Sequence, residues 1–323
     1  MTHITSKRLI NCAKNSQKSE GRVIKSASNL FVVDADFGMV SCVARKNAKL
    51  NIGEEGKLQR QKRYEFEAKN SNIIAGDFVR LEKGENNEWI IIEVKKRKNS
   101  LIRPQVANID QVLAIVAPIP KPDFSLIDKL IINSVRQGID IVLCLNKTDL
   151  DDGGLLAELT AQYGGVVKKI IYSCAKKGDI GLLKKVLLGK LTALAGQSAV
   201  GKSSIINALT KSEKQKTDAL SEKIGRGKNT TTRAEIIKLS PKTYVIDTPG
   251  FSMLDIHGIL EGELDLYYNE YVKESGDCKY NRCTHTTEPN CKIRELVESG
   301  ELNMARYERY CQMHFSLKNK KGF

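Results

Sequence analysis

Apolar residues follow three different patterns along the chain, and each pattern predicts a different architecture. Between Gly21 and Arg103 they alternate with polar residues in short runs that Gly, Asn and Asp turns separate. A period of two is typical of half-buried β-strands. The strand candidates are residues 22–24, 30–33, 39–44, 64–67, 77–81 and 89–94. Short strands at this spacing predict a small β-barrel, for which the five-stranded OB type is the natural candidate.

From Ile109 onward the apolar runs become continuous and alternate with helical patterns. Buried strands are expected over residues 109–117, 139–145 and 191–195, and further strands over 169–172, 234–239 and 243–246. Helical spacing is found over residues 125–137, 180–191 and 203–209. Strands alternating with helices predict a doubly wound α/β sheet. Past Gly250 the chain is mainly helical, with a helical stretch over 301–317.

These patterns predict a multidomain α/β protein. We expect a flexible basic arm over residues 1–20, an OB-like barrel over 21–103, an α/β domain over 104–262 and a helical domain over 263–323. Arg103-Pro104 ends the barrel, because the residue before a proline is driven toward extended geometry.

The segment from Gly196 to Ser203 matches the phosphate-binding P-loop pattern, G-x-x-x-x-G-K-[ST], between a predicted strand and a predicted helix. The glycines allow close approach of phosphate, and the loop N–H groups with the helix N-terminus face the anion. Lys202 is expected to reach the β- and γ-phosphates, and Ser203 to ligate Mg²⁺. The residues expected to bind the nucleotide here are Gly196, Gln197, Ser198, Ala199, Val200, Gly201, Lys202, Ser203 and Ser204.

Two further segments predict that the base is guanine. The strand over 139–145 runs into Asn146-Lys147-Thr148-Asp149, the N-K-x-D pattern of GTPases. A carboxylate at Asp149 accepts hydrogen bonds from the N1–H and 2-amino groups of guanine, which adenine lacks. Asn146 either bonds the base or ties loops together, and Lys147 lies along the ring. The segment Ser173-Cys174-Ala175-Lys176 resembles the S-A-K loop, from which we assign Ser173 and Ala175 to the base site.

Two segments after the P-loop resemble the switches of GTPases. Residues 225–233 are polar and basic, and Thr231 is expected to complete the Mg²⁺ shell beside Ser203 when the γ-phosphate is present. Asp247-Thr248-Pro249-Gly250 resembles the third GTPase motif: Asp247 holds a Mg²⁺-bound water and the Gly250 N–H senses the γ-phosphate. We assign catalytic roles to Thr231 and Lys202.

The order of these motifs is rotated. Ordinary GTPases place the P-loop first and N-K-x-D late, whereas here N-K-x-D precedes the P-loop. A doubly wound sheet tolerates such a rotation if the old termini are bridged and a new break falls in a loop. The middle domain is therefore predicted to be a circularly permuted P-loop GTPase, with both flanking domains attached at its second switch.

A cluster of soft ligands lies in the helical C-terminal part. Cys278, Cys283, His285 and Cys291 offer three thiolates and one imidazole, a set suited to tetrahedral Zn²⁺. With no open position, the ion is expected to be structural, one per chain. Cys311 and His314 lie in a later helical stretch and are interpreted as non-ligands.

The net charge of +14 favours a polyanionic partner, with nucleic acid ahead of a membrane. Residues 1–105 hold 21 Lys and Arg against 12 Asp and Glu, a net charge of +9. Together with exposed aromatic residues this predicts an RNA-binding barrel; a barrel used only as a rigid spacer is the alternative. We find no apolar run near 18 residues and no signal-peptide core, so we expect a cytosolic protein.

Together these motifs resemble the RsgA family of circularly permuted GTPases over residues 21–315. The resemblance implies a cytoplasmic bacterial factor that binds the maturing 30S ribosomal subunit, contacts 16S rRNA and hydrolyses GTP when the subunit stimulates it. Family members often have a histidine before the switch threonines, where this chain has Asn229. We expect a monomer with GTP or GDP, Mg²⁺ and Zn²⁺ bound.

Two other functions are compatible with parts of the pattern. One is an RNA-binding module whose nucleotide is structural and not hydrolysed, against which the full motif set argues. The other is an ATP-dependent enzyme, which Asn146 and Asp149 disfavour. Phe251 stands where many GTPases have a glutamine that orients water, and His257 is a lesser candidate for that role.

Overall fold

The computed structural model describes residues 17–27, 30–50, 73–101, 105–216, 236–247, 256 and 258–319. The chain divides into two compact units, with breaks at Ile73/Ile74, Gly76/Asp77 and Lys96/Arg97. The first unit contains the barrel, and the second contains the α/β sheet and the C-terminal helices. No helix among the described residues is long and apolar enough to cross a membrane.

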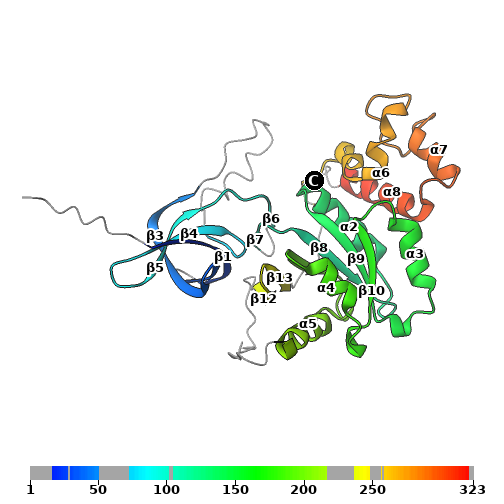
Figure 1. Ribbon diagram of the computed structural model, residues 1–323. Helices are drawn as coiled ribbons and strands as arrows, with labels where there is room; N and C mark the ends of the chain where they lie inside the picture. The colour runs from blue at the N-terminus through cyan, green and yellow to red at the C-terminus, as the bar shows by residue number, and fades with distance from the viewer. Residues whose placement is uncertain are drawn as a thin grey trace, which may run out of the picture. The chain divides into compact units, whose positions relative to one another are not determined.

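The first unit is a closed five-stranded barrel, coloured blue to cyan in Figure 1. Its strands are β1 (Lys18–Ala27), β2 (Leu30–Ala35), β3 (Gly38–Leu50), β4 (Phe78–Lys83) and β5 (Trp89–Val94). They pair in the order β1-β2-β3-β5-β4, and β4 closes the barrel on β1. The β3–β5 pair is parallel, whereas the other pairs are antiparallel. This confirms the predicted barrel.

Alternation along these strands fills the barrel interior with apolar side chains, including Val23, Val33, Leu81 and Ile91, which are all fully buried. The strand predicted over 64–67 lies outside the described residues. β1 begins at Lys18, so residues 18–20, which the sequence assigned to the flexible arm, belong to the barrel. Their backbone pairs with Leu81 and its neighbours on β4, a contact that the sequence does not reveal.

The second unit contains a six-stranded sheet in the order β10-β9-β8-β11-β13-β12. Its strands are β8 (Gln111–Val116), β9 (Asp140–Asn146), β10 (Lys169–Ser173), β11 (Leu191–Ala195), β12 (Ile236–Ser240) and β13 (Thr243–Asp247). All neighbours are parallel except β12, which pairs antiparallel with β13 at the edge. β8, β9 and β11 are almost continuously apolar, because helices cover both faces of a parallel sheet. β10 lies at the edge of the sheet and exposes Lys169 and Tyr172.

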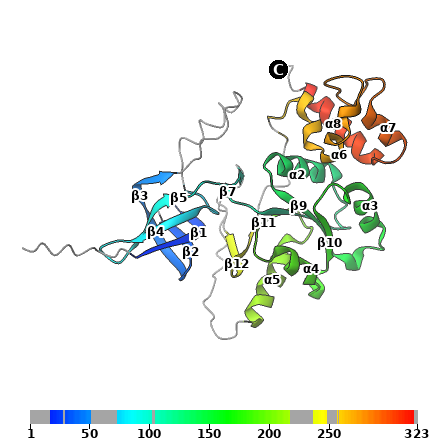
Figure 2. The same ribbon diagram turned by 45° about the horizontal axis from the view of Figure 1, so that its top comes forward.

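Four helices accompany this sheet: α2 (Phe124–Arg136), α3 (Gly154–Tyr163), α4 (Gly181–Leu187) and α5 (Lys202–Lys216). α4 and α5 bury Leu183, Leu187, Ile205 and Leu209 against one face of the sheet. α2 lies on the other side in both views (Figures 1 and 2). The helix predicted over 180–191 is shorter than expected, because the chain turns at Gly189, which has a φ of 72°, before entering β11. A short ribbon of β6 (Ser100–Leu101) and β7 (Val106–Ala107) precedes the sheet.

The C-terminal part is built from short helical turns and two longer helices. They are η4 (Glu261–Glu263), η5 (Asp265–Tyr267), α6 (Asn269–Val272), η6 (Ser275–Asp277), α7 (Lys292–Glu298) and α8 (Met304–Asn319). In its core the rings of Tyr268 and Tyr271 stack, and the ring of Tyr310 meets both of them edge to face. Ile132 of α2 belongs to the same core, so this part packs directly on the α/β sheet's helical layer.

Candidate nucleotide site and metal centre

The P-loop has the backbone geometry that its two glycines predict. Gly196 has a φ of 138°, and a Cβ there would lie 2.2 Å from the Ile115 carbonyl oxygen. Gly201 has a φ of 101°, and its Cβ would lie 2.3 Å from Nδ2 of Asn146. Both contacts are too short for any side chain, so glycine is required at each position. α5 begins at Lys202, so the last two residues of the motif form the first turn of the helix.

Lys202 lies folded over the P-loop. Its Nζ donates to the carbonyl oxygens of Gly196, at 2.7 Å, and Gln197, at 2.6 Å. Partial burial lowers the pKa of this ammonium group, and the negative charge of Asp247 acts in the opposite direction. Asp247 is the last residue of β13, beside β11 in the sheet. The cation is therefore held at the loop that the sequence assigned to phosphate.

Asn146 joins three of the predicted motifs. Its Nδ2 donates to the carbonyl oxygen of Val200 in the P-loop, at 2.9 Å. Its Oδ1 accepts from the Ser173 hydroxyl at 3.1 Å and from the Ala175 N–H at 3.3 Å. The side chain is buried, being 2% exposed. Of the two roles open for Asn146, the structure shows that it ties the loops together.

The rest of the N-K-T-D segment lies at the surface beside this junction. Lys147 adopts a left-handed conformation, with a φ of 61°, and its Nζ donates to the carbonyl oxygen of Ile119 at 2.8 Å. The Thr148 hydroxyl donates to the Ser173 carbonyl oxygen at 3.4 Å. Asp149 is exposed.

Sequence reasoning missed Cys174. Its thiol donates to Oδ1 of Asp149 at 3.2 Å, and this hydrogen bond is the main reason that the pKa of the Asp149 carboxyl is lowered. The only signal in the sequence is the position of a side-chain donor between Ser173 and Ala175. The thiol orients one oxygen of the carboxylate that the sequence assigned to guanine.

Most of the other P-loop residues are accessible to solvent. Gln197 is half-buried, Val200 is buried, and the remaining four are exposed: Ser198, Ala199, Ser203 and Ser204. Ala199 has a φ of 63°. Thr231, Gly250, Asn229, Phe251 and His257 lie outside the described residues, so the predicted switch positions stay predictions.

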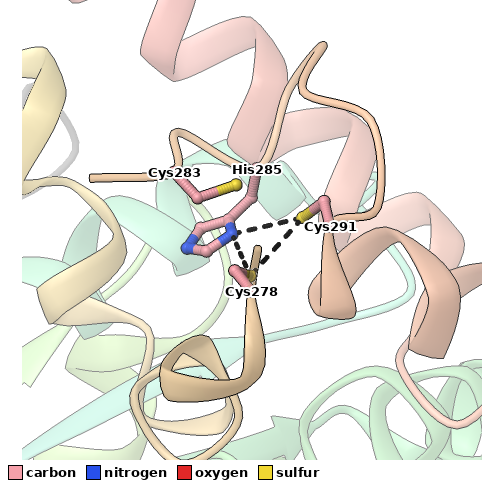
Figure 3. A group of neighbouring side chains, drawn as sticks. All are labelled: Cys278, Cys283, His285 and Cys291. Atoms are coloured by element: carbon pink, nitrogen blue, oxygen red, sulfur yellow. Dashed lines mark hydrogen bonds between the residues drawn. The ribbon is translucent and has the colours of Figure 1, made fainter. Parts of the chain in front are cut away.

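The four predicted metal ligands form one cluster (Figure 3). The thiols of Cys278 and Cys291 lie 3.9 Å apart, and Nδ1 of His285 lies 3.6 Å from the first and 3.3 Å from the second. With Cys283 included, all four ligand atoms lie within 4.8 Å of one another. A tetrahedral zinc ion with bonds of about 2.0–2.3 Å holds its ligand atoms roughly 3.3–3.8 Å apart. The cluster thus fits a four-coordinate ion.

The surrounding chain holds this cluster in place. His285 has a φ of 59°, and its carbonyl oxygen accepts from the Tyr307 hydroxyl of α8 at 2.9 Å. The Tyr310 hydroxyl donates to the Thr284 carbonyl oxygen at 2.7 Å. Burial raises the pKa of the Cys283 thiol to about 12, so a cation is needed to stabilise a thiolate there. Cys311 and His314 are not members of the metal-ligand group found among the described residues.

Comparison with known proteins agrees with this geometry. A family model described as RsgA GTPase matches residues 94–257. A protein of Alkaliphilus metalliredigens named small ribosomal subunit biogenesis GTPase RsgA is 35% identical over 94% of this chain and 100% of its own length. A protein of the same name from Thermotoga maritima is 38% identical over 79% of this chain and 87% of its own.

Two solved structures are similar to this chain over most of its length. The crystal structure of YjeQ from Thermotoga maritima superposes with a TM-score of 0.76, at 33% identity, over 93% of this chain and 99% of that one. YloQ, described as a circularly permuted GTPase, superposes with a TM-score of 0.71, at 26% identity, over 95% and 97%. The rotated motif order read from the residues and the matches along most of the chain lead to one conclusion: this chain belongs to the RsgA GTPase family, whose members are hydrolases acting on GTP.

Proposed function

We propose that this GTPase acts in biogenesis of the small ribosomal subunit, as the names of its relatives indicate, and that the subunit stimulates its hydrolysis of GTP to GDP and phosphate. The observation that carries the nucleotide site is the set of hydrogen bonds made by Asn146. They bring the P-loop, the N-K-T-D segment and the Ser173–Ala175 loop to one place, although these segments lie far apart in sequence.

Within this site we assign roles by chemistry. Asp149 reads the guanine base, and Lys202 leaves its carbonyl partners to neutralise the β- and γ-phosphates. Ser203 and Thr231 would ligate Mg²⁺, and Asp247 would hold it through a water. The backbone of Ala175 would contact the base O6, and the Gly250 N–H would sense the γ-phosphate. GTP hydrolysis requires Mg²⁺ because the ion offsets charge that builds on the phosphates.

Replacing Asp149 by asparagine tests the base site. The carboxylate offers two acceptors to guanine, whereas the amide offers one acceptor and one donor. We expect Asp149→Asn to weaken GTP binding by about a hundredfold and to favour xanthosine triphosphate, because the amide turns a donor toward the N1–H and 2-amino donors of guanine, whereas xanthine offers an acceptor there. Competition of GTP, xanthosine triphosphate and ATP against a fluorescent guanine nucleotide measures this. Asp152→Asn, an exposed acid in the next loop, is the matched control. Unchanged GTP affinity in Asp149→Asn contradicts the assignment.

We assign the Cys₃His cluster to zinc, with a structural role. Three thiolates and an imidazole prefer Zn²⁺ over harder cations, and four protein ligands leave no position for substrate. Figure 3 shows the four side chains converging from the segment between η6 and α7.

We infer that the partner is the 30S subunit and that the contact includes 16S rRNA. The basic first third supplies charge, and the barrel presents exposed aromatic surface. Phe37 is 53% exposed and stacks on Trp89 with ring centroids 4.7 Å apart. Aromatic faces bordered by cations are a common platform for single-stranded RNA. We further propose that the protein is a monomer and is located in the cytoplasm, where ribosomal subunits are assembled.

Salt dependence tests the RNA contact. A protein that neutralises several phosphates releases their counterions, so its affinity falls on the order of a thousandfold between 50 and 200 mM salt. We expect a steep loss of this kind for binding to purified small subunits, measured by co-sedimentation in the presence of a non-hydrolysable GTP analogue. A nearly flat dependence indicates a protein-mediated contact and contradicts the inference.

A further inference from the structure

A buried carboxylate connects the C-terminal helix α8 to helix α2 of the GTPase sheet. Asp128 of α2 is fully buried, and Arg306 of α8 is 3% exposed. Nη1 of Arg306 and Nε of Arg309 each donate to a different oxygen of Asp128. Nε of Arg306 also donates to Glu270 at 2.5 Å. Because an unpaired buried charge is costly, α8 and α2 are held in a fixed relation.

Arg309 also contacts the end of α3 and the first turn of α2. Its Nη2 donates to two α3 side chains, Oε1 of Gln162 at 2.7 Å and the Tyr163 hydroxyl at 3.1 Å. Its guanidinium group lies over the ring of Phe124, 5.3 Å from the centroid. Phe124 is the first residue of α2, and its carbonyl oxygen accepts from the Tyr163 hydroxyl at 3.4 Å. One arginine thus contacts both ends of the segment from Phe124 to Asp128.

The same turn is bonded to the P-loop on its other side. Asp123 caps α2, its Oδ1 accepting from the Leu126 N–H at 3.0 Å. The Asp123 N–H donates to Oε1 of Gln197 at 3.0 Å, and Nε2 of Gln197 donates to the Lys121 carbonyl oxygen at 3.3 Å. Gln197 is the second residue of the P-loop, and its own carbonyl oxygen accepts from Lys202.

We propose that Arg309 is a positioning residue for the nucleotide site, acting through the first turn of α2 on Gln197 and so on the conformation of the P-loop. The C-terminal domain then sets nucleotide affinity without touching the nucleotide. Because the first turn of α2 is bonded on both sides, it moves as a unit. A shift of α8 therefore displaces Asp123, whose N–H donates to Gln197. This inference rests on the proposed nucleotide role of the P-loop.

A double-mutant cycle tests the proposal on the full-length protein. The variants are Arg309→Ala, Gln197→Ala and their combination, and the readout is affinity for a fluorescent GDP analogue with Mg²⁺. We expect each single change to weaken binding about tenfold, and the double variant to be weakened by about tenfold as well, not a hundredfold. Changes at residues far apart without a shared partner ordinarily add, so non-additivity is the specific signature. Lys318→Ala, an exposed cation on α8, is the matched control and leaves affinity unchanged.

Two results overturn the proposal. One is an additive, hundredfold loss in the double variant. The other is a lower melting temperature for Arg309→Ala with unchanged GDP affinity, which identifies Arg309 as a structural brace only. If Arg309→Ala does not fold, Arg309→Lys enters the same cycle, since it keeps the charge beside Asp128 and removes the planar group over Phe124.

Lys202→Ala tests the nucleotide role of the P-loop separately from the role of Arg309. If this variant binds GDP normally, the P-loop assignment itself is wrong, whatever Arg309 does.

Discussion

Replacement of Cys283 by alanine is expected to release the bound metal ion and to unfold the chain around residues 275–295. The region has little regular structure of its own, and its core residues pack around the cluster. The apparent binding free energy of structural zinc is about 10–16 kcal/mol in zinc-finger peptides, and it appears as folding free energy. Losing one of four ligands removes a large part of this stabilisation.

The measurement pairs metal analysis of the purified protein with limited proteolysis of the C-terminal region. The parent protein should carry close to one zinc ion per chain, and Cys283→Ala should carry little and be cut near residues 275–295. Cys311→Ala is the matched control, because this half-buried cysteine of α8 is not a member of the ligand group. Full zinc content in Cys283→Ala contradicts the proposed ligand set.

GTP hydrolysis by the isolated protein is expected to be slow and to increase by several powers of ten when small ribosomal subunits are added. Phe251 has no group that can orient the attacking water, so that orientation must come from elsewhere. We propose that docking on the subunit brings Thr231 onto Mg²⁺ and aligns a water molecule. A catalytic group supplied by a partner protein raises the hydrolysis rate of P-loop GTPases by on the order of 10³–10⁵, so a change of this size is within reach of a docking partner.

Single-turnover hydrolysis at saturating GTP, with and without purified 30S particles, measures this effect. Large subunits serve as a control for nonspecific stimulation by ribosomal RNA, and Thr231→Ala should lose the stimulated rate while GDP affinity stays within a few-fold of the parent. A rate constant that is already fast in isolation and unchanged by 30S particles identifies a free-standing GTPase and ends the proposed role of the subunit.

Local pattern predicts the elements whose apolar residues either alternate with polar ones or form one continuous run. The continuous apolar runs at 139–145 and 191–195 predict β9 and β11, because a strand that is buried on both faces carries apolar side chains on both. The P-loop glycines are also predicted locally, by the motif, although the contacts with Ile115 and Asn146 that exclude a side chain there are tertiary. β1 was predicted to start too late, because residues 18–20 owe their structure to pairing with β4 and not to their own polar sequence.

Residue type at short spacing was enough to predict the motif set, its rotated order and the group of three cysteines and one histidine. The partners of these side chains came from the packed fold alone. It assigned Asn146 to the junction of three loops, placed the Cys174 thiol on Asp149, and paired Asp128 with Arg306 and Arg309. The physical reason is that a buried polar group needs a hydrogen-bond partner, and many side chains in the sequence could serve as that partner. Which of them lies within hydrogen-bond distance depends on how the whole chain packs.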